Sequence, residues 1–489
     1  MLGQVERTLT SVVLSLSFVS VACAQAPELE RKLNDRLFEG TASESSRSAS
    51  TLFGAYLELT DPPMEVGSYF NLTTIWPGMD GWDSVASWAA SNEQMGEALL
   101  EAQSSLILGM PYGEAAVSSD WRDNDVVTLI ASDGDLSDVS YPYLYGAMDT
   151  IACWATAEFY RLLEAGEHEK AFDIGLAFLR VLRQGCEQEM LEEKVWFMDT
   201  LSDALSIQRD AMYTYRDSIS PDVYRKLGIK EYPFLKPTDD QRMRRLEMPE
   251  GDRVVAEAMI RETFDAAGQA DAEKFARVFG SLQARDEPLT RFGTRRRWQR
   301  LSTVHASQDA SLEKLTDVYD DWWRRWRMRQ YDSMMDTPTE LSRLNEIRFA
   351  AIVLIAKDLD DAFKSRNRLI ANINGTILSA GLCGYYSTFG QAWPKSLAPI
   401  YAVSAVKRFD FDPYNKSYGR FVYRKLRSRR SIETDYGQLW IDADGCMLYS
   451  IGTDHADGGG TISSVDGSNG DLLVWPPTRQ LARDEGKLD

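Results

Sequence analysis

Acidic residues gather on one glycine-rich stretch in the last part of the sequence. Asp454, Asp457, Asp466 and Asp471 surround the triplet Gly458-Gly459-Gly460, and no Lys or Arg occurs between positions 454 and 471. Hard cations such as Ca²⁺ prefer several oxygen ligands, and glycine lets backbone carbonyls turn inward. The stretch is not an EF-hand, because no Glu stands at the twelfth position of a loop. It predicts a calcium site, with a loop that holds no metal as the alternative.

Two pairs of aspartates on aromatic stretches are candidates for hydrolytic chemistry. Asp80 and Asp83 lie in Trp76-Pro-Gly-Met-Asp-Gly-Trp-Asp, and Asp320 and Asp321 precede a tryptophan. Glycoside hydrolysis needs two carboxyl groups about 5–9 Å apart across the scissile bond. Neighbouring residues on a helix point to different faces, so Asp320 and Asp321 should not converge. The favoured interpretation is that these aspartates cap helices or pair with arginines.

No sequence motif of a known catalytic class is present. There is no Gly-x-Ser-x-Gly elbow, Walker loop, dinucleotide glycine fingerprint or His-Glu-x-x-His pair. The three histidines are far apart in the sequence, which argues against a histidine-based zinc site or triad: His168, His305 and His455. The sequence therefore favours a protein without catalytic activity, with a carbohydrate-active α/α-barrel-like hydrolase using paired carboxylates as the alternative.

Composition excludes some partners and permits a large core. The 489 residues carry 54 Lys and Arg against 74 Asp and Glu, a net charge of −20. Such an acidic balance disfavours nucleic acid, whose phosphates need a basic face. Hydrophobic residues make up 44% and aromatics 11%, enough for a large core. Two stretches that mix Arg and Trp, 295–300 and 322–329, are interpreted as solvated helix faces.

Residues 1–26 have the character of a signal peptide. The apolar stretch from Leu9 to Ala22 is uncharged, is too short to span a membrane comfortably, and ends in small residues that suit cleavage. The prediction is an exported protein of the periplasm, cell envelope or medium, and Cys23 leaves lipidation as a minor alternative. No later apolar run reaches about 18 residues, so no transmembrane helix is expected in the mature chain.

Four cysteines remain after removal of that segment. In an exported protein an even number permits two disulfides, and pairing within each expected domain favours Cys153 with Cys186 and Cys383 with Cys446. Four free buried thiols are the equally weighted alternative.

Helical periodicity dominates the first three quarters of the chain. Apolar residues recur every three or four positions from 92 to 108, and the stretch 151–163, Gly166 and 171–181 predicts a helix, a turn and a second helix. This hairpin is of tetratricopeptide type, but no clean 34-residue period follows it. We expect a helical domain at 27–230, a turn-rich linker at 231–252 and a second helical block at 253–366.

The pattern changes in the region 367–489. A helix from Leu369 to Tyr386 is followed by short apolar or alternating runs at 420–424, 438–442 and 447–452, separated by turn residues. Such runs predict antiparallel strands. The predicted fold class is therefore mainly α, built of helical hairpins that could stack as in a solenoid, with a C-terminal α+β module of one long helix on a small antiparallel sheet.

The C-terminal region resembles the globular part of type II secretion major pseudopilins. The resemblance rests on the helix followed by Trp393-Pro-Lys-Ser-Leu, Phe411-Asp-Pro-Tyr-Asn and Leu448-Tyr-Ser-Ile-Gly-Thr-Asp, and it covers about residues 367–477. In that family the loop after the last motif binds calcium. By position, the resemblance implies that the ligands are the Ile451 carbonyl, Asp454 and Asp471, with Asp457 and Asp466 as looser assignments.

The chain departs from pilus subunits at its start. It lacks their Gly-Phe-Thr-Leu-Ile-Glu signature and long apolar assembly helix, so a structural role in a pilus is rejected. The whole sequence instead resembles large exported helical proteins of planctomycete-type bacteria, a group without assigned activity, through "LLEAGEHEKAFDIGLAFLRVLRQG" and the ending described above. The resulting prediction is an exported envelope scaffold or protein-binding protein whose partner is a protein or envelope component, and whose C-terminal module calcium stabilises.

Overall fold

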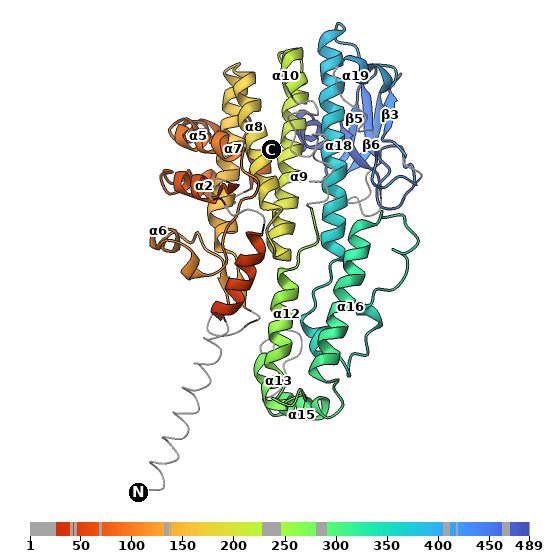
Figure 1. Cartoon of the computed structure of the whole chain (residues 1–489). Helices are drawn as coiled ribbons and strands as arrows, with labels where there is room; N and C mark the ends of the chain where they lie inside the picture. Colours follow the sequence, from red (N-terminus) through yellow and green to blue (C-terminus); the bar gives the residue numbers. More distant parts are fainter. Residues whose placement is uncertain are drawn as a thin grey trace, which may run out of the picture.

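The computed structural model describes residues 26–39, 43, 46–67, 71–131, 136, 138–226, 246–279, 291–403, 411–416, 419–461 and 470–488. The predicted signal peptide, apart from Ala26, lies outside these ranges, as does most of the predicted linker 231–252. Within them the chain is mainly helical, with a small antiparallel sheet region in its C-terminal part (Figure 1). This confirms the coarse prediction of the fold class. No helix in the described ranges is both long and apolar enough to cross a membrane.

Short helices form the first layer of the molecule. After a helix at 26–37 come α2 (Ala49–Tyr56), α3 (Met64–Gly67), η2 (Leu72–Thr74), α4 (Trp82–Ala90), α5 (Glu93–Ala102), η3 (Glu114–Ala116), α6 (Ser119–Asp123) and the strand pair β1 (Leu129–Ile130) and β2 (Val139–Ser140). The helix expected at 92–108 is shorter in the structure, where α5 ends at Ala102. The β1–β2 pair was not predicted.

Three long helices follow with two short ones and form the centre. They are η5 (Leu144–Met148), α7 (Asp149–Glu164), α8 (His168–Gly185), α9 (Leu191–Thr214) and α10 (Pro221–Lys226). The predicted hairpin is confirmed as α7 and α8, which pack against each other. Gly166 has a φ of +76°, the left-handed conformation that favours glycine after a helix end. Small and aromatic residues interlock across the pair, as where the Phe159 and Phe172 rings meet edge to face at 5.3 Å.

The second helical block lies at the lower end of the molecule in Figure 1. It comprises α12 (Gly251–Glu262), α13 (Ala272–Val278), α15 (Arg291–Ser302), α16 (Gln308–Arg327), η7 (Leu341–Arg343) and α17 (Ala350–Ile355). Helix α16 is amphipathic. Trp322 and Trp326 are buried, whereas Trp323 is 42% exposed with the Arg327 guanidinium 3.4 Å from its ring centroid.

The C-terminal part consists of one long helix, a small sheet and a hairpin. Its elements are α18 (Asp360–Thr388), α19 (Ala398–Val403), β3 (Val422–Lys425), β4 (Arg430–Thr434), β5 (Gly437–Ile441), β6 (Cys446–Ser450), β7 (Leu472–Trp475) and α20 (Thr478–Asp484). Strands β3, β6 and β7 form an antiparallel sheet in the order β3–β6–β7, and β4 pairs with β5. The predicted antiparallel strands are confirmed, and the long helix begins nine residues earlier than Leu369.

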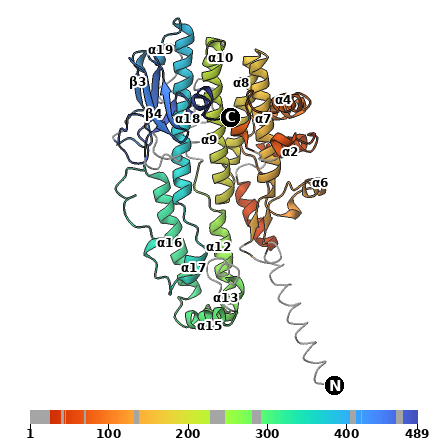
Figure 2. The same ribbon diagram turned by 180° about the vertical axis from the view of Figure 1, so that it is seen from behind.

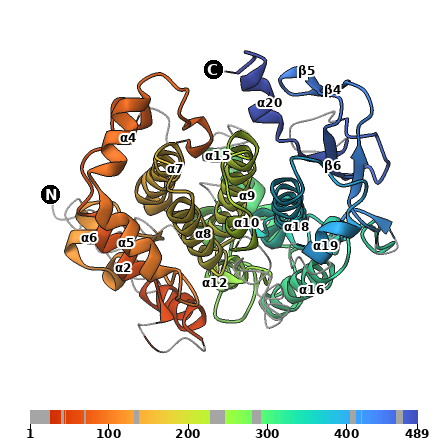
Figure 3. The same cartoon turned by 90° about the horizontal axis from the view of Figure 1, so that it is seen from above.

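The elements form successive layers across the molecule. Seen from above, they run from α2, α4 and α5 through α7 and α8 to α9, then to α18 and the sheet (Figure 3). The view from behind in Figure 2 also places the sheet and the short first helices on opposite sides of α9 and α18. Helix α20 returns to pack against α9 and β5. One apolar core extends from the first helices to one face of the sheet, from Leu29 to Trp475, and a second, smaller cluster lies between the sheet, the β4–β5 hairpin and α20.

The two central helices are joined closely to the sheet. Helix α9 is buried on nearly every side, and α18 packs along it on one side and against β6 and β7 on the other. Gly375 in α18 allows this approach, because a Cβ there would lie 2.6 Å from the Cγ1 atom of Val474 in β7. The helical body and the C-terminal sheet are therefore packed into one core.

Candidate functional site

A polar cavity of about 450 Å³ lies where α9 and α18 meet β7, the β4–β5 turn and the start of α20. We call it the seam cavity. Helix α9 contributes Asp199, Asp203 and Asp210 to its wall. The spacing of four and seven residues keeps these carboxylates on one face of the helix. Nothing in the local sequence marks them as a group, because their surroundings come from residues more than 150 positions away.

Arginines face these acids from three elements. Arg209 of α9 donates to the Thr376 hydroxyl at 2.6 Å and to the Asn372 side-chain oxygen at 3.0 Å on α18. Arg479 of α20 donates to the Ser206 hydroxyl at 3.0 Å and pairs with Asp210 at 3.4 Å. The wall therefore alternates acidic, basic and hydroxyl groups.

Burial and charge act in opposite directions on these groups. Burial raises the pKa of Asp203 above its ordinary value, although the charges of Arg479, Arg368 and Arg209 lower it. Burial alone would lower the pKa of Arg479, but the charges of Asp210 and Asp203 act in the opposite direction, and its pKa lies above the ordinary value. Burial likewise raises the pKa of Asp199 and Asp210, so all three α9 acids of this wall are held in the same balance.

Ser202 is a polar side chain of this wall whose hydrogen bonding is incomplete. It lines the seam cavity, is 8% exposed, and its hydroxyl has no hydrogen-bond partner in the described structure. A buried hydroxyl is normally paired. The Ser202 hydroxyl oxygen is itself enclosed, so a molecule bound in the cavity would reach it after a rotation of the side chain and could then donate or accept a hydrogen bond.

The residues predicted as calcium ligands lie beside the sheet. The Asp454 carboxylate accepts from the Ala456 N–H at 3.0 Å, and Asp457 pairs with Arg424 at 2.6 Å and accepts from the Tyr449 hydroxyl at 2.7 Å. Asp466 lies outside the described residues. In the described part of the chain, no group of three His, Cys, Asp or Glu side chains is arranged as metal ligands would be.

Asp471 connects the acidic loop to the seam cavity. It is fully buried, lines the cavity, and accepts from the backbone N–H groups of Gly460 at 2.5 Å and Gly458 at 3.3 Å. Burial raises its pKa, the two backbone donors lower it, and the charges of Asp457 and Asp454 raise it again. Asp457 and Asp454 are therefore close enough to repel Asp471, although each of the three acids has a donor in the protein.

One buried acid that fixes the loop was missed in the sequence. Asp412 accepts from the Ser450 hydroxyl at 2.7 Å and from the Ile451 N–H at 3.0 Å, so it holds the predicted ligand Ile451 at the start of the loop. Burial raises the pKa of Asp412. Its place in Phe411-Asp-Pro-Tyr-Asn is the signal that could have found it, because Asp before Pro often forms a turn.

The aspartates considered for hydrolysis have other roles. Asp80 and Asp83 are exposed, and Asp83 lies in the first turn of α4. Asp320 is exposed, whereas Asp321 is buried and pairs with Arg325 at 2.9 Å. None of the four lines the seam cavity. The interpretation that Asp321 pairs with an arginine is confirmed.

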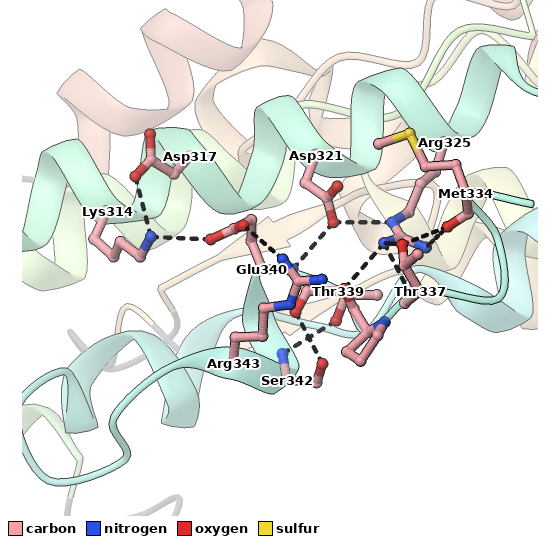
Figure 4. Close-up of polar contacts among 11 residues, drawn as sticks. Lys314, Asp317, Asp321, Arg325, Met334, Thr337, Thr339, Glu340, Ser342 and Arg343 are labelled. Carbon is pink, nitrogen blue, oxygen red and sulfur yellow. Dashed lines mark hydrogen bonds and ion pairs between the residues drawn. The ribbon is translucent and has the colours of Figure 1, made fainter.

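Figure 4 shows what that buried pair does. Besides holding Asp321, Arg325 donates to the carbonyl oxygens of Met334 at 3.1 Å and Thr337 at 3.0 Å. Asp321 also accepts from the Glu340 N–H at 3.1 Å, and Glu340 pairs with Lys314 at 3.0 Å. The network fastens the segment after α16 back onto that helix, so it is structural.

A second, apolar depression lies at the lower end of the molecule. This α15–α17 groove, of about 830 Å³, is lined by the side chains of the two helices and of the segments beside them. Three of its aliphatic side chains are open to solvent: Val304 is 56% exposed, Ile347 58% and Val353 39%. Arg296 and Arg300 border it together with Glu346.

The four cysteines in the described ranges form no disulfide in this structure. All four described cysteines are buried and free: Cys153, Cys186, Cys383 and Cys446. This is the second of the two alternatives drawn from the sequence. Burial raises the pKa of every one of these thiols, so none is a reactive thiolate.

Comparison with known proteins finds no relative, so a proposal about function depends on the geometry described above. No family model matches the chain, and neither a curated protein nor a solved structure shows significant similarity to it.

Proposed function

We propose that the protein is an exported cell-envelope scaffold that binds another protein in the α15–α17 groove. The observation that carries the proposal is the exposure of Val304, Ile347 and Val353 within one depression. Contiguous apolar surface on a soluble face is costly in water and commonly marks an interaction site. Single exposed aliphatic residues elsewhere on the surface carry no such meaning.

The charges around the groove indicate the chemistry of the partner. Helix α15, with the sequence RFGTRRRWQRLS, carries five arginines and no acid, and Arg296 and Arg300 border the groove. Glu346 is the acid among the described lining residues. A helix with an apolar face and acidic flanks complements this surface, since opposite potentials favour encounter and binding.

The rest of the fold suits a platform. Helices α9 and α18 share a core with the sheet, and the pair Asp210–Arg479 ties α9 to α20. Such packing limits movement between the central helices and the C-terminal sheet. The export prediction and the pseudopilin-like character of the C-terminal region come from the sequence and remain part of the proposal.

The test uses two labelled peptides with the same apolar helix face. One carries acidic flanks and the other basic flanks, and fluorescence anisotropy measures the binding of each to the full chain. We expect the acidic peptide to bind at least about tenfold more tightly. Ile347→Asp and Val304→Asp should abolish this binding. Met64→Asp is the matched control, because Met64 is 82% exposed on another face.

Two outcomes would refute the docking site. One is equal binding of both peptides, and the other is binding that the two groove substitutions leave unchanged. Residues 280–290, just before α15, lie outside the described ranges. A variant with 281–289 replaced by Gly and Ser tests whether the chain itself occupies the groove. Peptide binding by this variant, and not by the unmodified chain, would show that it does.

We retain the hydrolase alternative on one observation. Asp199 and Asp203 share one helix face and one cavity, and Cβ atoms at this spacing lie roughly 5–6 Å apart. Hydrolysis of a glycoside, however, places its carboxyl groups on both sides of the scissile bond. Two acids on the same face of one helix fit this requirement poorly. Release of reducing sugar from an oligosaccharide, lost in Asp203→Asn, would establish the alternative.

A further inference from the structure

We propose that the seam cavity is a binding site for a small neutral polyhydroxylated ligand, such as a sugar unit. This site is separate from the α15–α17 groove and does not depend on the docking proposal. Three observations carry it: the cavity itself, the alternation of acidic and basic groups on its wall, and the buried Ser202 hydroxyl without a partner.

The balance of charges disfavours an ionic ligand. The three α9 acids of the cavity face three lining arginines on three helices, Arg209, Arg368 and Arg479. Asp471 already accepts from two backbone N–H groups, and Asp435 is exposed at the β4–β5 turn. A cation would approach the arginines, and an anion would approach the acids. A neutral molecule is repelled by neither set of charges.

Hydroxyl groups match such a wall. Each hydroxyl donates one hydrogen bond and accepts up to two, so it can join a carboxylate to a guanidinium. Ser202 and Asp203 are neighbours on α9, and both line the cavity. A ligand hydroxyl there would pair the unmet serine and give the half-buried Asp203 a donor. Tyr436, on the turn of the β4–β5 hairpin, adds one aromatic ring to the wall.

The size of the cavity is consistent with this class. About 450 Å³ lies within the range of roughly 300–1,000 Å³ that small-molecule sites occupy. The wall is mostly polar, with aliphatic side chains only from the β7 residues and Pro477. A lipid or another apolar molecule would leave these polar groups without partners.

Calorimetry on the full chain tests the proposal. The panel contains neutral hexoses, N-acetylhexosamines, pentoses, linear polyols and neutral disaccharides, with glycine, inorganic phosphate and putrescine as charged probes. We expect one-site binding of at least one neutral compound and none of the charged probes. Ser202→Ala and Asp203→Asn should each weaken that binding about tenfold. Asp320→Asn, an exposed aspartate on α16, is the matched control and should bind as the unmodified chain does.

Each other outcome counts against the site. Absence of binding by every neutral compound overturns it, as does binding of a charged probe alone or binding that both variants leave unchanged. Melting curves show whether each variant is folded. If Asp203→Asn does not fold, Ser202→Ala still tests the site, because it removes only one oxygen atom. Ile347→Asp should bind sugar normally, which separates failure of this site from failure of the peptide groove.

Discussion

Asp210 and Arg479 form an ion pair across 269 positions of sequence, with 3.4 Å between the carboxylate and the guanidinium. Arg483, one turn further along α20, adds a second contact to Asp210 at 3.8 Å. The acid is almost completely buried. The pair thus joins the middle of the helical body to the helix that follows the sheet.

Removal of one partner should destabilise the protein strongly. Arg479→Gln leaves Asp210 buried with Arg483 as its remaining ion-pair partner and the charge of Arg209 nearby, and breaking a buried pair costs up to about 3–5 kcal/mol. Urea unfolding measures the loss. Arg225→Gln is the control, because its pair with Asp222 has both side chains more than half exposed and should contribute less than about 1 kcal/mol. Equal losses of unfolding free energy in the two variants would show that the buried pair stabilises the protein no more than the exposed one.

Glu193 should make stability depend on pH near neutrality. Burial raises its pKa to about 7, although hydrogen bonds from Tyr143, Tyr112 and Gln188 lower it. A folded-state pKa above the unfolded value means that the contribution is fully present below about pH 4.5 and is lost as pH rises through 7. The full effect is roughly 3 kcal/mol. Unfolding at pH 5 and pH 8 should show it.

The Glu193→Gln variant tests the assignment of that pH dependence. Its stability should change less between pH 5 and pH 8 than that of the unmodified chain. Burial also raises the pKa of Asp149 to about 7, so some dependence should remain until Asp149→Asn is added. An unchanged pH profile in the double variant would exclude both groups as its cause.

The contact at Gly375 predicts a compensating pair of substitutions. Gly375→Ala places a methyl group 2.6 Å from the Cγ1 atom of Val474 and should cost about 1–3 kcal/mol. Val474→Ala should recover part of this loss in the double variant. Gly54→Ala in α2 is the control, because its new Cβ meets nothing within 4 Å. Thermal unfolding of the four variants gives the coupling free energy between Gly375 and Val474. A loss in the double variant equal to the sum of the two single losses would contradict the contact.

Calcium should raise the melting temperature of the full chain if the acidic loop binds it. A concentration of one hundred times the dissociation constant stabilises by about 2.7 kcal/mol. Asp454→Ala should remove the shift, since this carboxylate has only a local backbone donor in the structure. Magnesium serves as the control ion. No shift with calcium, compared with a chelator, would reject the calcium proposal.

Thiol counting can decide between the two cysteine alternatives. Buried free thiols should be slow to react in the native protein and should all react after unfolding without reductant. Chain purified from an oxidising compartment is the appropriate sample. Fewer reactive thiols than cysteines would show that disulfides form there.

Local patterns predicted local structure well. The α7–α8 hairpin follows from its apolar period and Gly166, and the pairing of Asp321 with Arg325 follows from a spacing of four residues on one helix. The start of α18 was missed because residues 360–368 are mostly polar, and only the packing of the whole helix on α9 shows why it extends there. The calcium ligands cannot be judged the same way, since part of their loop lies outside the described residues.

The seam cavity could not be predicted from any one segment. Its α9 acids carry no recognisable motif, and the arginines that oppose them come from α18 and α20 as well as from α9 itself. Only the return of α20 to α9 brings these groups together. Sequence periodicity reports which face of a helix is buried, but not which distant charge meets it.

The connection between α9 and α20 also has a consequence for biosynthesis. The ribosome makes Asp210 long before Arg479 and Arg483, so the nascent helical body must bury an acid whose partners do not yet exist. Its final packing therefore waits for a helix encoded some 270 codons later. Interrupted synthesis would leave that acid unmatched, a defect that proteases of the compartment could detect as incomplete folding.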